Sequence, residues 1–196
     1  MTPLRLLSPA DYRRMPWKNG GGRTTEIAAH PPASAIDAFT WRASVADVSR
    51  DGPFSAFPGV ERTLVLLDGA GMRLADGGGS IDLVARYEPY AFAGEQALEC
   101  TLVAGPVRDF NLMIRRDIAR GSLAVVRDET YVLPASRYRL CYVAAGACEC
   151  LIAGHAPIAV PLDHALLVES TDAHVLHVNP RMADTVAIVA AIDVDD

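Results

Sequence analysis

A carboxylate and an amide lie two positions apart in the segment GPVRDFNLM, at Asp109 and Asn111. On a β-strand this spacing puts both side chains on one face, opposite Phe110. A carboxylate beside an amide can bind the amide, hydroxyl or ammonium group of a ligand. Asp109 could instead form a salt bridge with Arg42 or Arg62, and the residues alone leave both interpretations open. Nothing nearby has the arrangement of a nucleophile and its base.

The segment MPWKNGGGRTTEI combines Trp17, Lys18 and Asn19 with three consecutive glycines. It does not fit a phosphate loop, because the lysine precedes the glycines and the following residues are β-branched rather than helical. We expect a tight loop whose glycines allow positive φ and close approach of backbone N–H groups. Lys18 and Asn19 would add a cation and an amide to such a site, and the alternative is a structural turn with a solvated lysine.

Two arginines lie at the start of strand-like runs that follow. In FTWRASVADV the residues alternate, so Arg42 and Ser44 share a polar face that either meets water or lines a polar cavity inside a barrel. Arg62 begins the next strand and points either inward or into solvent. Between them, Phe57 is expected to plug the end of a barrel, and Phe54 is a possible wall of a site.

Metal-binding spacings are weak in this chain. The five histidines do not form an H-x-H pair, and His174 and His177, spaced i, i+3, would point to opposite faces of a strand. The cysteines lie in apolar, strand-like runs and are most simply free core thiols: Cys100, Cys141, Cys148 and Cys150. We therefore expect no metal and no other cofactor.

The composition indicates a globular protein: of 196 residues, 51% are hydrophobic and 21% charged. The length suits one large domain or two small fused ones. A net charge of −6 argues against nucleic acid as a partner. No run approaches the ~20 apolar residues that span a bilayer, and no signal peptide is recognised, so we expect a cytoplasmic protein without a membrane partner.

Most of the chain consists of short apolar runs separated by Gly, Pro and Asp, which predicts an all-β sandwich or barrel. One segment, SPADYRRM, has the start signals of a helix, with Ser8 as N-cap, Pro9 at the first helical position and Asp11 in the first turn. It predicts a short N-terminal helix of one or two turns.

Residues 63–77 align without a gap with residues 140–154. Gly69 then matches Gly146, and Leu74 matches Leu151, each pair with the same offset of 146 − 69 = 77 residues. Both blocks show a strand, a glycine turn and a second strand. Two copies of one β unit predict a duplicated small barrel.

Three segments together resemble the HutD/Ves family: MPWKNGGGRTTEI, FTWRASVADVSRDGPFSAFPGVERTLVLLDG and GPVRDFNLMIRR, in this order. The resemblance is strong over residues 4–116, and the remainder fits in its β-rich pattern. It implies an all-β double cupin (a bicupin of RmlC-like jelly-roll barrels). The chain would then be one compact bicupin unit over residues 1–196, with halves of about 1–116 and 117–196.

The resemblance also implies a function. Members are often encoded with histidine-utilisation genes, and HutD is thought to be a non-enzymatic governor of that pathway that binds an intermediate such as N-formylglutamate. This chain lacks the histidine and glutamate metal set of catalytic cupins, which agrees with a binding role. The positions that match the family motifs are the candidate ligand-binding residues: Trp17, Lys18, Asn19, Arg42, Ser44, Arg62, Asp109 and Asn111.

We therefore expect a metal-free regulatory protein that binds a small carboxylate, with Lys18, Arg42 and Arg62 as the cations and the two arginines binding bidentately. One alternative is a cupin-type isomerase or hydrolase, with Asp109 as general base or a metal at His174 or His177. Another alternative is a regulatory module that binds other proteins. The exposed strand edges of double cupins also make a homodimer an expected assembly.

Overall fold

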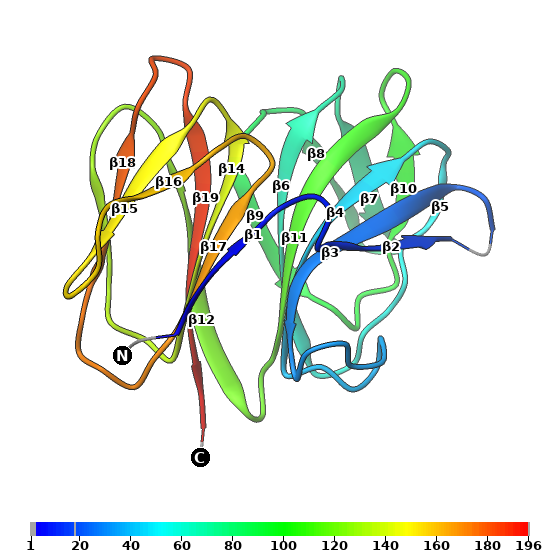
Figure 1. The fold of residues 1–196 in the computed structure, drawn as a ribbon. Helices are drawn as coiled ribbons and strands as arrows, with labels where there is room; N and C mark the ends of the chain where they lie inside the picture. The colour runs from blue at the N-terminus through cyan, green and yellow to red at the C-terminus, as the bar shows by residue number, and fades with distance from the viewer. Residues whose placement is uncertain (1–2, 18, 196) are drawn as a thin grey trace. The chain divides into compact units, whose positions relative to one another are not determined.

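The structure, a computed structural model, describes residues 3–17 and 19–195 (Figure 1). In this part of the chain there are nineteen β-strands and no helix. Accordingly, no helix long and apolar enough to cross a membrane is found among the described residues. The chain divides into an N-terminal unit, Arg13–Ile118, and a C-terminal unit made of Met1–Tyr12 together with Ala119–Asp196.

The N-terminal unit consists of two antiparallel sheets. Their strand orders are β2-β3-β4-β11-β6-β9 and β5-β10-β7-β8. Buried apolar side chains of both sheets, among them Leu64 and Met72, form one cluster that packs the sheets together. The strands are β2 (Arg13–Pro16), β3 (Gly22–His30), β4 (Trp41–Val48), β5 (Gly52–Pro53), β6 (Val60–Asp68), β7 (Met72–Asp76), β8 (Gly79–Leu83), β9 (Pro89–Ala93), β10 (Glu99–Leu102) and β11 (Val107–Arg115).

The C-terminal unit also has two antiparallel sheets, in the orders β1-β17-β14-β19-β12 and β13-β18-β15-β16. Its first strand comes from the other end of the chain: β1 pairs with β17, with Leu4 opposite Val168 (Figure 1). The strands are β1 (Leu4–Leu7), β12 (Ala119–Val126), β13 (Tyr131–Leu133), β14 (Tyr138–Ala145), β15 (Cys148–Ile152), β16 (Ile158–Val160), β17 (Ala165–Glu169), β18 (Leu176–Pro180) and β19 (Val186–Val194).

The predicted internal repeat is confirmed by the topology. Residues 63–77 run from β6 through β7, and residues 140–154 run from β14 through β15. Each block is followed by a strand that pairs with it, β8 in the first copy and β16 in the second. The order β4-β11-β6-β9 in one unit corresponds to β12-β19-β14-β17 in the other, and β5-β10-β7-β8 corresponds to β13-β18-β15-β16.

The short N-terminal helix expected at residues 8–15 is wrong. The capping residues are used as the sequence suggests, because Asp11 Oδ2 accepts hydrogen bonds from the backbone N–H and the hydroxyl of Ser8, both at 2.7 Å. These bonds close a single turn, and the chain then enters β2, where Arg13 lies opposite Glu26 of β3. A helix this short is marginal in water, and the strand ladder prevails over the local signal.

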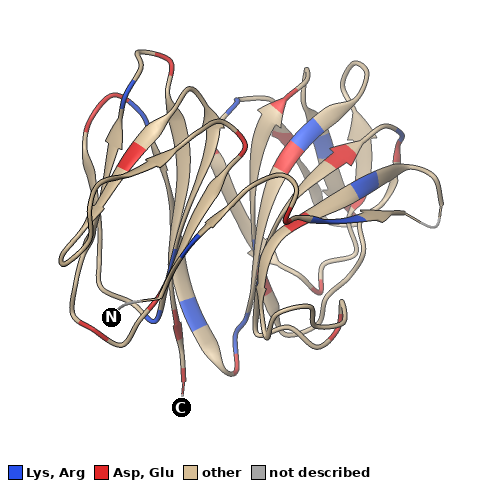
Figure 2. Cartoon of the chain, in the orientation of Figure 1, with Lys and Arg blue, Asp and Glu red and all other residues tan. Residues whose placement is uncertain are grey.

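The cysteines are free and buried, as predicted. Cys148 and Cys150 lie on one face of β15 and share an apolar cluster with Cys141 of the neighbouring sheet. Basic and acidic residues are interspersed along both units (Figure 2). The interiors of the two units differ: the central strands of the N-terminal unit carry several buried polar side chains, whereas those of the C-terminal unit carry Arg139 among mostly apolar side chains.

Candidate functional site

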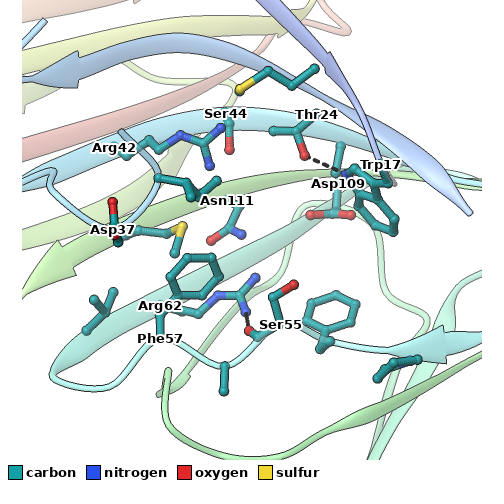
Figure 3. A pocket seen from close by; sticks show the side chains of 18 of the residues that line it. Trp17, Thr24, Asp37, Arg42, Ser44, Ser55, Phe57, Arg62, Asp109 and Asn111 are labelled. Atoms are coloured by element: carbon teal, nitrogen blue, oxygen red, sulfur yellow. Dashed lines mark hydrogen bonds between the residues drawn. The ribbon is translucent and has the colours of Figure 1, made fainter. Parts of the chain in front are cut away.

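A cavity of about 780 Å³ opens in the N-terminal unit (Figure 3). Its walls come from the sheet β2-β3-β4-β11-β6 and from the segment that follows β5. The eighth candidate residue, Lys18, lies outside the described residues. The other seven candidate residues all line this cavity: Trp17, Asn19, Arg42, Ser44, Arg62, Asp109 and Asn111.

The polar face of β4 lines the cavity and does not meet water. Arg42 is 4% exposed and Ser44 is 1% exposed, and both border the cavity. The opposite face of the strand is buried as well, including Trp41 and Ala43. Of the two alternatives that the alternation left open, the polar cavity inside a barrel is therefore confirmed.

Arg42 is held by a carboxylate that the sequence analysis missed. Its Nε donates to Glu26 Oε2 at 2.7 Å, and Arg13 Nη2 reaches the same oxygen at 3.2 Å. Glu26 lies opposite Ser44 in the pairing of β3 with β4, and it is buried. Alternation along RTTEI puts Thr24 and Glu26 on one face and would have marked Glu26 as a polar candidate, but its bond to Arg42 depends on the register of β3 with β4.

Arg62 is enclosed by aromatic rings. Its guanidinium carbon lies 5.1 Å from the ring centroids of Phe54 and Phe92 and 5.4 Å from that of Phe57. Its Nη1 donates to the carbonyl oxygen of Ser55 at 3.1 Å. Phe54 and Phe57 both line the cavity, so the aromatic pair forms one wall of it and also positions the arginine.

Asp109 and Asn111 lie side by side on β11, in the centre of the sheet. Burial raises the pKa of Asp109 to about 7, with Arg62 acting to lower it and Asp47 to raise it. Burial also lowers the pKa of Arg62 to about 10, so this guanidinium stays charged near neutral pH. A salt bridge of Asp109 with Arg42 or Arg62, one of the two alternatives that the sequence left open, is absent among the described residues.

Four buried polar atoms of the candidate residues that line the cavity have no hydrogen-bond partner within the described part of the chain. Two are donors, Arg42 Nη2 and Arg62 Nε, and two are acceptors, Asp109 Oδ2 and Asn111 Oδ1. Buried polar groups in native proteins are nearly always paired, and an unpaired one costs about 1–3 kcal/mol. A ligand with both acceptors and donors would satisfy all four.

The glycine segment is a tight loop between β2 and β3, as predicted. The backbone N–H of Trp17 donates to the carbonyl of Gly22 at 2.9 Å, and the indole Nε1 donates to Thr24 Oγ1 at 2.8 Å. Asn19 Oδ1 accepts from the N–H of Gly21 at 2.9 Å, so the amide oxygen stabilises the loop itself. The loop thereby fixes Trp17 at the wall of the cavity.

A second loop at the cavity gave no signal in the sequence. Arg115 Nη2 donates to the carbonyl of Asp37 at 2.8 Å, and its Nε donates to the carbonyl of Phe39 at 3.2 Å. Asp37 and Ile36 line the cavity beside it. Since these bonds go to backbone oxygens of an irregular segment, residue type alone does not indicate them.

No group of three His, Cys, Asp or Glu side chains that could hold a metal ion occurs in residues 3–17 and 19–195.

Residues 9–187 match the model of the family HutD. The chain belongs to the HutD family. An uncharacterised 21.2 kDa protein from the region 3′ of hutC in Pseudomonas putida is 36% identical over 172 residues, 88% of this chain and 90% of that protein. Protein Ves of Cronobacter sakazakii is 39% identical over 141 residues, 70% of this chain and 76% of that protein.

Solved structures agree with this family and with the fold. HutD from Pseudomonas fluorescens, in a formate condition, has a TM-score of 0.84 at 29% identity, with 99% of this chain and 100% of that chain covered. An oxalate decarboxylase of Bacillus subtilis, at 8% identity, shares the fold alone, with a TM-score of 0.63 over 97% of this chain and 77% of that chain. The all-β double-cupin fold expected for the HutD family is confirmed.

Proposed function

We propose that this protein binds a small carboxylic acid that also carries an N–H donor, without a metal, and regulates histidine catabolism in the cytoplasm. One observation carries the proposal. Two buried N–H donors and two buried acceptors lack partners, and their four residues line the same cavity. A pair of groups that would act as nucleophile and base is not among the described residues of the cavity.

In this proposal Arg42 and Arg62 bind the carboxylate, because guanidinium groups match its geometry and carry permanent charge. Asn111 and Asp109 accept hydrogen bonds from an amide or formamide N–H. Trp17 and the ring of Phe54 enclose the aliphatic part. N-formylglutamate has all three features, and the position of the Pseudomonas putida relative near hutC agrees with a ligand from this pathway.

The test is calorimetric titration of the protein with N-formylglutamate, urocanate and histidine. We expect at least one to bind at millimolar concentration or below. Arg42→Ala should weaken that binding by roughly 10- to 100-fold, the loss of about 1.5–3 kcal/mol typical of a hydrogen bond to a charged group.

Arg73→Ala is the matched control for this titration, because Arg73 pairs with Asp82 on the exposed sheet edge, away from the cavity lining. It should leave the affinity unchanged. Failure of all three compounds to bind would reject the ligand class. Equal affinities of the wild type and Arg42→Ala would reject the site.

A second candidate function is proton transfer, because a carboxyl group with a pKa of about 7 has the strength expected of a general base near neutral pH. In that case Asp109 would act on an intermediate bound by the two arginines. Incubation of the protein with each of the three compounds, followed by mass spectrometry, separates the two candidates. Product that disappears in Asp109→Asn would support the enzyme.

A further inference from the structure

The register of the central sheet arranges the cavity residues in three rows. Asp109 lies opposite Ala46 of β4 and Leu66 of β6, and two residues along β11, Asn111 lies opposite Ser44 and Leu64. The third row holds Met113, with Arg42 on one side and Arg62 on the other. The backbones of both arginines therefore lie in one row of the sheet, and the backbone of Asp109 lies two rows away.

This arrangement separates the charges of the cavity along the strands. Each row is about 7 Å from the next, so the backbones of the arginine row and the Asp109 row are about 14 Å apart. The long arginine side chains reduce this gap without closing it, since no ion pair joins Asp109 to either arginine within the described residues. A ligand between them meets donors at one end and an acceptor at the other.

We infer that Asp109 determines which chemical class of ligand the cavity accepts. The inference deepens the proposed function and rests on it. Ionised, Asp109 accepts a hydrogen bond from an amide or amine N–H while the arginines hold a carboxylate. Protonated, Asp109 instead donates a hydrogen bond to an oxygen, and the cavity then takes a ligand with a second carboxylate.

The groups around Asp109 support a change of protonation at this position. Arg62 on β6 favours the charged form, Asp47 on β4 opposes it, and burial opposes it most strongly, which raises the pKa to about 7. Cys100 on β10 is a further neighbour, and burial, followed by the charge of Asp109, raises the pKa of its thiol to about 12.

Two other basic residues are candidate neighbours of Asp109, Arg42 and Lys18. Arg42 on β4 has its charge balanced by Glu26 on β3. Lys18 lies outside the described residues. The guanidinium of Arg62 therefore lowers the pKa of Asp109, whereas burial raises it.

A pair of probes of equal length tests this inference. Glutaramate carries one carboxylate and one primary amide, and glutarate carries two carboxylates. Between pH 6 and pH 8 the dissociation constant of glutaramate should fall about tenfold, because it binds the ionised form of Asp109. That of glutarate should rise about tenfold over the same range, because it requires the protonated form.

Two further readouts identify the group that titrates. Calorimetry of glutarate at pH 8 in buffers of different ionisation enthalpy should show uptake of about one proton per ligand, and glutaramate should show none. In Asp109→Asn, which keeps the size and removes the titration, both dissociation constants should become independent of pH. Asp82→Asn, a surface carboxylate of the same unit, should behave as the wild type.

The outcomes distinguish the role of Asp109 from the existence of the carboxylate site. Binding of both probes with a ratio that does not change with pH would overturn the role of Asp109 and leave the carboxylate site standing. An unchanged pH profile in Asp109→Asn, with a wild-type melting curve, would have the same meaning. If neither glutaramate nor glutarate binds at millimolar concentration, the carboxylate site is rejected, and this inference is rejected with it.

Discussion

The two units of the chain share one strand order and differ in what fills them. In the N-terminal unit, Asn111 lies between Ser44 and Leu64. At the corresponding place in the C-terminal unit, Val189 lies between Ala124 and Cys141. The same register thus carries an amide and a hydroxyl in one barrel, and only small or apolar side chains in the other.

The correspondence extends along both central strands. Asp109 is matched by Ala187, which lies opposite Val143 as Asp109 lies opposite Leu66. Ala187, Val189 and Cys141 all belong to the buried apolar cluster of the C-terminal unit. The double-cupin topology therefore does not require a polar interior, and the topology alone does not account for the polar rows of the N-terminal unit.

One polar position is kept in both units. Arg62 and Arg139 differ by 139 − 62 = 77 residues, the offset of the internal repeat. Both are buried, and the Nη1 of Arg139 donates to the carbonyl of His174, as that of Arg62 donates to the carbonyl of Ser55. In each unit a loop carbonyl thus accepts a hydrogen bond from the arginine. Only in the N-terminal unit does the neighbouring strand carry a carboxylate and an amide, Asp109 and Asn111 of β11.

The largest effect is expected when the carboxylate is moved to the other barrel. Ala187→Asp places a charge among packed apolar side chains, and we expect it to lower the free energy of unfolding by more than about 4 kcal/mol. Asp109→Ala removes a buried carboxyl group whose pKa is raised by burial, so near neutral pH it should leave the free energy of unfolding unchanged or raise it. Urea denaturation measures both, and equal costs would contradict the difference between the units.

A somewhat smaller effect concerns pH. The pKa of Asp109 rises from 3.8 to about 7 on folding, so between these values the folded protein holds a proton that the unfolded chain has lost. The free energy of unfolding should therefore fall as the pH rises from 4 to 7, by up to about 4 kcal/mol from this group. The difference between Asp109→Asn and the wild type isolates it, and a difference that does not change with pH would contradict the buried carboxyl group.

The smallest effect concerns the glycine loop, which joins two strands, β2 and β3, that have no counterpart beyond β12 in the described sheet of the C-terminal unit. A Cβ on Gly22 would lie 2.3 Å from the carbonyl oxygen of Asp47 and 3.2 Å from the ring of Trp17. Gly22→Ala should therefore cost more than about 2 kcal/mol and displace the indole, which tryptophan fluorescence reports.

Gly20 provides the control in the same loop. It has a φ of 67° with open space around it, so Gly20→Ala should cost only about 1 kcal/mol and leave the fluorescence unchanged. If Gly22→Ala were as mild as Gly20→Ala, close packing of this loop against β4 would not fix the wall of the cavity.

Local patterns in the sequence were sufficient to predict most of the strands and the repeat, whereas the seven described cavity residues were selected by the resemblance to the HutD/Ves family motifs. Alternation puts Arg42 with Ser44 and Asp109 with Asn111, and the glycine turns at residues 69 and 146 mark the repeat. The partners of these residues were harder to predict. The bond between Arg42 and Glu26 depends on the register of two strands, and the pairing of β1 with β17 joins segments about 160 residues apart.

The wrong helix has a related cause. Ser8 and Asp11 form the hydrogen bonds of a helix start, but the same bonds also close an isolated turn. Which of the two follows depends on whether residues 13–16 find a strand partner, and that partner, β3, begins after the glycine loop. Long-range pairing of this kind has no local signature.

Hydrogen exchange of the whole chain, with and without saturating N-formylglutamate, tests the central claim most directly. The account predicts slower exchange in the N-terminal unit, in peptides from β4, β6 and β11, and unchanged exchange in the corresponding strands β12, β14 and β19. Protection confined to the C-terminal unit, or no protection in β4, β6 and β11, would contradict it.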